Sequence, residues 1–374
     1  MYFCQPNCKT IVSFKTNTHL MKSLFAERFK SARLMNGLSL QDLSDRLQNK
    51  ITRQALHKYE NGSVMPDSEM LALLCDAFGI RPDYFFRNTE VELGEIEFRK
   101  LKKLPIKEES RILEHAKDYL SRYLELEQLL NIETVFKNPL EGMAPVKSFD
   151  DVEKAAMDVR SAWKMGTNAI ANVIELLEDN YIKVIFIEAG DEYDGMQTKI
   201  VGNNIPVIAI NESKNKRADR KRFTAMHELA HLLLPIPKDL PEKEKERICH
   251  QFAGAILFPA EALKKELGNK RTRIHVRELG ALKKQYGISM QAIIMRAKDL
   301  EIISESTCRQ LFVLFKQMNW RVDEPVSYEA NESSNRFDQL LYRALAEDVI
   351  SVSKAAALKN MKVAEFHQQS LSVG

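Results

Sequence analysis

Long apolar runs are absent from the 374-residue sequence. A membrane-spanning helix needs about 20 consecutive apolar residues, so no membrane partner is expected. Cysteine is scarce as well. The five cysteines, at 4, 8, 75, 249 and 308, form no even, closely spaced framework, which favours a reducing cytosol. The opening residues lack the apolar stretch and cleavage site of a secretory signal, so we expect a cytoplasmic protein.

Neither sign of charge predominates. The sequence has 55 Lys and Arg and 52 Asp and Glu, a formal net charge of +3, so composition neither demands nor excludes binding to nucleic acid. The length suits two or three domains rather than one core. Residues 1–20 are expected to be a disordered leader, because chain termini are commonly unstructured.

Residues 21–87 show the pattern of five short helices separated by turns. Ser39 is a good N-cap for the second helix, and Asn61-Gly62 is a C-terminal signal for the third. The stretch GLSLQDL, followed by ITRQALHKYENGSVMPD, resembles the Xre family of phage-repressor-like helix-turn-helix domains over about residues 24–86. Caps, turns and core positions agree with that family in order.

The resemblance implies that the third helix enters the major groove of double-stranded operator DNA. Arg53 is then expected to bind guanine and Gln54 adenine. Further expected DNA contacts are Thr52 and His57 over the bases, Gln41 at a phosphate or outer base, and Lys58, Asn61 and Ser63 at the backbone. Residues 21–87 contain ten Lys/Arg against eight Asp/Glu, a modest excess that predicts a homodimer on two half-sites. The alternative is a small five-helix module used only for protein contact or dimerisation.

The rest of the chain predicts an α+β fold that is mainly α. Residues 88–147 read as a linker with a long helix from about 106 to 130, and residues 263–374 as a helical C-terminal region. Residues 148–262 read as a mixed domain with a small sheet. Its expected elements are helices over 149–163 and 168–179, strands over 182–187 and 206–211, and helices over 217–234 and 241–258.

The most specific motif is HELAH at 227–231. Residues at i and i+4 lie on one helix face, so His227 and His231 can direct imidazole nitrogens at one metal ion. Glu228 lies about 100° further round the helix, where a general base can reach a water without binding the metal. The basic run from Lys214 to Arg222 is expected to be the solvated start of this helix, with contact to DNA as the alternative.

A third protein ligand is expected from the next helix, because catalytic zinc keeps three protein ligands and one open position. Glu246 continues the core-facing stripe of that helix, whereas Glu244 lies near the opposite face. Glu242 and His250 remain geometrically possible. Unranked candidates for stabilising the tetrahedral oxyanion are Tyr193, His250 and the arginines at 217–222.

The stretches RFTAMHELAHLLL and ERICHQFAGAILFP resemble the ImmA/IrrE family of zinc metallopeptidases, over about residues 150–260. Matching positions are Arg220, Phe223 and Thr224 before the motif, and Glu246, Phe252, Ala253, Leu257 and Pro259 after it. The resemblance implies Zn²⁺ held by His227, His231 and Glu246, with Glu228 as the catalytic base. Ala230 departs from the family's usual glycine, but both residues are small.

Two functions follow from these patterns. The resemblance implies a zinc endopeptidase brought to DNA by its helix-turn-helix half, where it cleaves a repressor or another regulatory partner protein. The alternative is a non-proteolytic transcriptional regulator or antitoxin that binds a cognate toxin. HELAH favours catalysis, because a purely structural zinc site does not need Glu228 and tends to close its fourth position.

Overall fold

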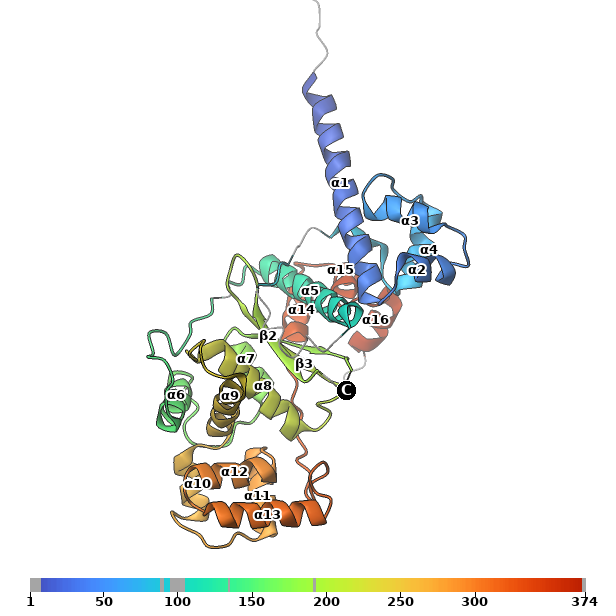
Figure 1. Ribbon diagram of the computed structural model, residues 1–374. Helices are drawn as coiled ribbons and strands as arrows, with labels where there is room; N and C mark the ends of the chain where they lie inside the picture. The colour runs from blue at the N-terminus through green and yellow to red at the C-terminus, as the bar shows by residue number, and fades with distance from the viewer. Residues whose placement is uncertain (1–7, 88–90, 95–104, 134, 191–192, 372–374) are drawn as a thin grey trace, which may run out of the picture. The chain divides into compact units, whose positions relative to one another are not determined.

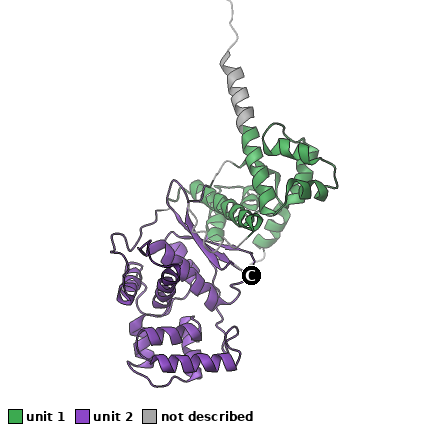
Figure 2. Cartoon of the chain, viewed as in Figure 1, with its two compact units in different colours: residues 1–91, 104–133, 337–374 green, residues 92–103, 134–336 purple. Residues whose placement is uncertain are grey.

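The computed structural model describes residues 8–87, 91–94, 105–133, 135–190 and 193–371. The chain forms two compact units (Figures 1 and 2): unit 1 comprises residues 1–91, 104–133 and 337–374, and unit 2 comprises residues 92–103 and 134–336. Helices dominate both units, and unit 2 contains a three-stranded sheet. The expected fold class is therefore confirmed. Among the described residues, no helix has the length and apolar character needed to cross a bilayer.

Unit 1 begins with the expected succession of short helices. They are α1 (Cys8–Met35), α2 (Leu40–Arg46), α3 (Arg53–Glu60), α4 (Ser68–Phe78) and the 3₁₀ helix η1 (Pro82–Phe86). Ser39 caps α2 in a reciprocal capping box with Asp42. After α3 the chain turns at Gly62, whose φ of 71° is the left-handed conformation that glycine adopts without steric cost.

The beginning of α1 falls in the segment expected to be a disordered leader. Residues 1–7 lie outside the described residues, and residues 8–20 are traced as the first turns of α1. The disordered leader over 1–20 therefore stays a prediction.

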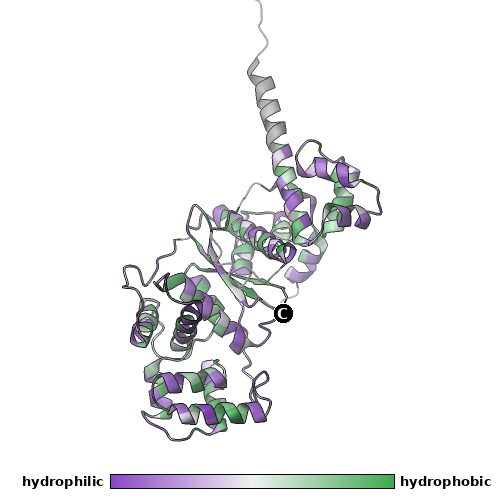
Figure 3. Ribbon diagram, viewed as in Figure 1, coloured by the Kyte–Doolittle hydropathy of each residue, from purple (hydrophilic) through white to green (hydrophobic). Residues whose placement is uncertain are grey.

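A long helix and the C-terminal helices complete unit 1. They are α5 (Ile106–Leu129), α14 (Arg336–Ala346), α15 (Val352–Leu358) and α16 (Val363–Leu371). Tyr123 and Leu126 on α5 share a buried cluster with Phe337 and Leu341 on α14. Figure 3 shows that the helices carry both polar and apolar residues, and here the apolar face of α5 is covered by residues more than 200 positions later in the sequence.

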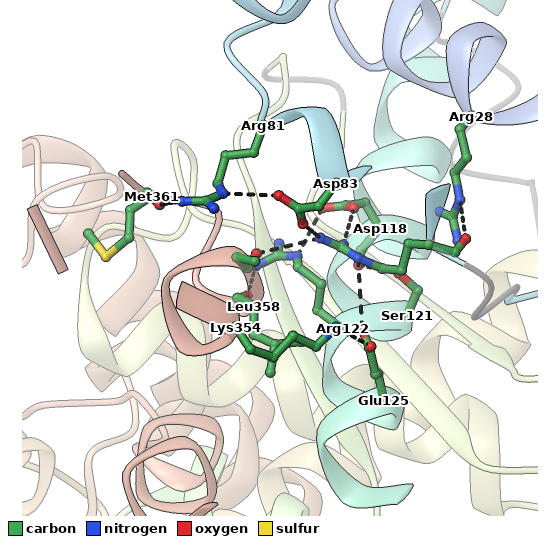
Figure 4. A network of polar contacts seen from close by, with 12 residues as sticks. Arg28, Arg81, Asp83, Asp118, Ser121, Arg122, Glu125, Lys354, Leu358 and Met361 are labelled. Atoms are coloured by element: carbon green, nitrogen blue, oxygen red, sulfur yellow. Dashed lines mark hydrogen bonds and ion pairs between the residues drawn. The ribbon is translucent and has the colours of Figure 1, made fainter. Parts of the chain in front are cut away.

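Charged side chains also connect the C-terminal helices to η1 and α5 (Figure 4). Arg122 on α5 donates to the Leu358 carbonyl at 2.8 Å and pairs with Asp118 at 3.0 Å. Asp118 in turn accepts from Arg87, which follows η1, at 3.3 Å. Helices α5 and α14–α16 thus bury their apolar faces against each other within unit 1. The expected domain bounds, including the linker (88–147) and the C-terminal region (263–374), stay predictions.

The sheet of unit 2 has the strand order β1-β3-β2. Strand β1 (Lys183–Ile187) pairs parallel with β3 (Pro206–Asn211), and β2 (Gly195–Lys199) pairs antiparallel on its other side. Every residue of β3 is buried, as expected of a central strand. Helix α8 packs against both β2 and β3, which places this helix directly on the sheet.

The remaining helices of unit 2 build one continuous core. They are α6 (Phe149–Ala162), α7 (Val173–Asp179), α8 (Ala218–Leu233), α9 (Glu242–Leu257), α10 (Ala260–Leu267), α11 (Val276–Tyr286), α12 (Met290–Asp299) and α13 (Glu305–Gln317). Helix α9 packs against α8, α6 and α12, and Leu229 of α8 and Phe252 of α9 are fully buried in the core. The two helices carrying the metal motif and its expected third ligand therefore pack side by side.

Candidate metal centre and DNA-reading surface

Two histidines on α8 direct their ring Nε2 atoms toward a common point. His227 is 4% exposed and His231 is half-buried, and their Nε2 atoms lie 3.2 Å apart. Their separation of four residues puts both on the same helix face, one turn apart. The convergence therefore follows directly from the HELAH spacing.

Glu246 of α9 completes a triangle with these histidines. Its Oε2 lies 3.2 Å from Nε2 of His227, and its Oε1 lies 3.5 Å from Nε2 of His231. Ligands bound at 2.0–2.1 Å around a tetrahedral zinc are about 3.3 Å from each other, so the three observed separations have the spacing of a tetrahedral ligand set. Among the described residues, this trio is also the group of His, Cys, Asp and Glu side chains that could hold a metal ion.

The other possible third ligands do not join this group. Glu242 begins α9 and is exposed. The ring of His250 lies 4.5 Å from the His227 ring, centroid to centroid, and its Nδ1 donates to the Glu246 carbonyl at 2.6 Å. His250 thus lies beside the triangle and contacts two of its members, His227 and Glu246.

Glu228 lies beside the triangle in a closed environment. Its side chain is 3% exposed, and the backbone of Gly195 on β2 approaches it closely: a Cβ atom at position 195 would lie 3.2 Å from Cγ of Glu228. The fully buried Tyr193 is also near. Burial raises the pKa of the Tyr193 phenol well above its usual range, and the Glu228 carboxylate raises it further.

Helix α3 presents its outer face to solvent. The residues expected to contact DNA are all exposed: Gln41, Thr52, Arg53, Gln54, His57, Lys58, Asn61 and Ser63. Thr52 is the N-cap and accepts from the Ala55 amide at 3.3 Å. Arg33 on α1 fixes the far end of α3 through its pair with Glu60, at 2.7 Å. This pair holds the helix against the core while its outer face stays open.

Comparison with known proteins identifies both parts of the chain. A helix-turn-helix family model matches residues 29–85, and the model of the IrrE N-terminal-like domain, from peptidase family M78, matches residues 177–298. The SPbeta prophage-derived uncharacterized HTH-type transcriptional regulator YonR of Bacillus subtilis (strain 168) is 37% identical over 75 residues, which are 20% of this chain and 68% of that protein. The chain belongs to the helix-turn-helix transcriptional regulators. Its IrrE-like domain adds the fold of a metallopeptidase family, which implies a bound metal, and both recognised resemblances are confirmed.

In this helix-turn-helix regulator, the sequence did not predict the role of one side chain near the metal trio. Cys249, one turn after Glu246, places its Sγ 3.5 Å from Nδ1 of His231. A partner on the second ring nitrogen orients an imidazole whose first nitrogen binds metal. The signal was present, since a residue three positions after Glu246 shares its helix face, but the pattern indicated only a core position.

The regulator's basic run at 214–222 is only partly solvated, which corrects the expectation for Arg222. This arginine is 0% exposed; it pairs with the buried Glu332 and donates to the Ile170 carbonyl at 2.7 Å. Arg220 instead binds Asp194 at 2.8 Å. These contacts therefore engage the guanidinium groups of Arg220 and Arg222 with residues outside the metal trio.

The Tyr193 side chain also has a hydrogen-bond partner within the regulator, since its hydroxyl donates to the Ala209 carbonyl at 3.2 Å. His250, another residue considered for oxyanion stabilisation, borders the trio through its ring contact with His227.

Proposed function

We propose that this transcriptional regulator binds operator DNA through α3 and carries an active zinc endopeptidase that cleaves a repressor or another regulatory partner protein. The observation that carries the proposal is the triangle of His227, His231 and Glu246, with edges of 3.2 to 3.5 Å. The placement of Glu228 next to this triangle supports catalysis over a purely structural role.

Zinc is the metal that this donor set fits best. Two imidazoles and one carboxylate form a ligand set typical of catalytic zinc, and three protein ligands leave one position open. A bound zinc supplies Lewis acidity, which lowers the pKa of water toward about 7 and polarises the scissile carbonyl. The protein's part is to keep the ligands in place, which Cys249 supports through its contact with His231.

Glu228 is proposed to be the catalytic base. It follows His227 directly on α8, so it stands at the metal trio without belonging to it. Its carboxylate takes a proton from water and gives it to the leaving amine. Gly195 leaves room for this side chain, and the surrounding burial excludes bulk water from it.

DNA reading is proposed for the exposed N-terminal half of α3. Arg53 presents a planar donor fork suited to guanine, and Gln54 an amide suited to adenine. Gln41, Thr52, His57, Lys58, Asn61 and Ser63 position the domain. Because the basic excess of residues 21–87 is small, we propose that a homodimer binds two half-sites one helical turn apart.

The proposal is tested with purified wild-type protein and Glu228→Gln. Each is assayed for zinc content, for operator binding and for cleavage of a regulator encoded beside it. We expect Glu228→Gln to retain zinc and DNA binding and to lose cleavage. If the wild type binds zinc and DNA but cleaves no candidate partner, the protein is instead a non-proteolytic regulator or an antitoxin, and binding to a neighbouring toxin becomes the measurement to make.

A further inference from the structure

A cavity of about 760 Å³ opens beside the metal trio. Helices α8, α9 and α12 contribute its walls, and Glu246, one of the three converging side chains, is part of its lining. The cavity therefore borders the candidate centre at Glu246. Its volume lies within the range of about 300–1,000 Å³ that small-molecule and peptide-binding pockets commonly show.

One face of α9 forms the first wall. Lys243, Arg247, His250 and Gly254 line the cavity at spacings of three and four residues, so they lie along one side of the helix. Lys243 and Arg247 are exposed at one end, and Gly254 is buried at the other. The wall therefore changes from charged to apolar along its length.

Aromatic rings link the cavity to the metal trio. The half-buried Phe223, which precedes His227 by one turn of α8, stacks on His250 with ring centroids 5.9 Å apart and an interplanar angle of 27°. His250 in turn lies 4.5 Å from the His227 ring. Phe223 and His250 both line the cavity, so a side chain that enters it meets these two rings.

Helix α12 forms the opposite wall. Met295 is 40% exposed and, with Ala292, contributes apolar surface. The guanidinium of Arg296 is held by Glu153 through two hydrogen bonds of 2.6 and 3.0 Å, so only its hydrocarbon stem faces Gly254. A Cβ atom at Gly254 would lie 3.0 Å from Cδ of Arg296, which shows how closely the two walls meet there.

We propose that this cavity is the specificity pocket of the peptidase and receives a large apolar side chain, such as Leu, Met or Phe, from a substrate residue beside the scissile bond. The inference rests on the proposed function. Carbon atoms supply most of the exposed lining, through Phe223, Ala292, Met295 and the hydrocarbon stems of the charged residues. Near the apolar wall, Arg296 is held by Glu153, and Asp299 is held by Lys298 and Gln251, which also line the cavity. Met295 offers an exposed apolar side chain to this pocket, and methionine adapts to side chains of different shape.

A peptide library tests the assignment on the full-length protein loaded with zinc. We expect cleavage sites, read by mass spectrometry, to show at least a tenfold preference for Leu, Met or Phe over Lys or Glu at one fixed position. Met295→Glu places a carboxylate in the pocket, so the apolar preference should fall about tenfold and Lys or Arg should become favoured. Met318→Glu is the matched control: Met318 is 50% exposed at the end of α13 and does not line the cavity.

Peptide retention separates this inference from the peptidase proposal. Glu228→Gln protein is incubated with the same library, and the retained peptides are identified with and without the additional Met295→Glu change. If Glu228→Gln retains apolar peptides and the additional Met295→Glu change abolishes this retention, the pocket is supported even if the wild type cleaves nothing. Cleavage or retention without an apolar preference, or a preference that Met295→Glu leaves unchanged, would overturn the pocket while leaving any observed peptidase activity intact.

Discussion

Gly195 on β2 and Glu228 on α8 meet so closely that a Cβ atom on the glycine would lie 3.2 Å from the glutamate Cγ. The same Cβ would lie 3.0 Å from Cγ2 of Thr224 and 3.1 Å from the Ala209 carbonyl oxygen. The backbone of edge strand β2 therefore lies directly against the proposed catalytic base, and this approach is possible because residue 195 has no side chain.

Gly195→Ala should impair catalysis while preserving metal binding. The added methyl group pushes on Glu228 and Thr224, with a cost to stability of about 1–3 kcal/mol. We expect zinc content to stay near that of the wild type and kcat to fall. Gly190→Ala is the control, because a Cβ at 190 meets nothing within 4 Å. Equal loss of kcat in both variants would remove the special role of position 195.

Cys249→Ala should weaken zinc binding by about 10- to 100-fold, because His231 loses the partner that orients its ring. Competition with a chelator of known affinity measures the change. Cys308→Ala serves for comparison, since Cys308 is also buried but lies on α13. Unchanged zinc affinity in Cys249→Ala would mean that this thiol only fills space.

Removing Glu332 should destabilise unit 2 strongly. Glu332 and Arg222 are 1% and 0% exposed, so Glu332→Ala leaves an unpaired buried charge, at a cost of about 3–5 kcal/mol. Urea unfolding followed by tryptophan fluorescence reports on this unit, because Trp163 and Trp320 both lie in it. Lys270→Ala, which breaks an exposed pair with Glu301 in the same unit, should change stability by less than about 1 kcal/mol. Similar midpoints for the two variants would contradict the assigned importance of the buried pair.

Arg53→Ala and Lys58→Ala should affect DNA binding in different ways. Loss of a base contact at Arg53 should cost about 1–3 kcal/mol on the operator alone and relax its sequence preference. Loss of a phosphate contact at Lys58 should weaken binding to all sequences and reduce the salt slope by about 1. Titration of operator and random DNA at several salt concentrations distinguishes them. If Arg53→Ala weakens both DNAs equally, Arg53 is a backbone contact.

The sequence predicted those features whose causes are local. The i, i+4 spacing of His227 and His231 sets their convergence, and the stripe that continues through Cys249 pointed to Glu246. The caps at Ser39 and Thr52 likewise depend on neighbouring residues. Their positions could be inferred because helical geometry determines which nearby residues share a face.

Features produced by distant partners were not predictable. Strand β2, with the sequence GMQTK, shows no clear apolar alternation and forms a strand through its pairing with β3. Arg222 is buried because Glu332, 110 residues later, neutralises it. The burial of α5 against α14 and α15 depends on contacts across more than 200 residues. Such pairings leave no periodic signal in either segment alone.

Zinc content after exhaustive dialysis, measured by mass spectrometry on the full-length protein, tests the metal centre most directly. The account predicts about one zinc per chain in the wild type and in Glu228→Gln. It predicts almost none in His227→Ala, His231→Ala or Glu246→Ala, with His367→Ala on the exposed face of α16 unchanged. A wild-type protein without metal, or trio variants that keep the full complement, would contradict it.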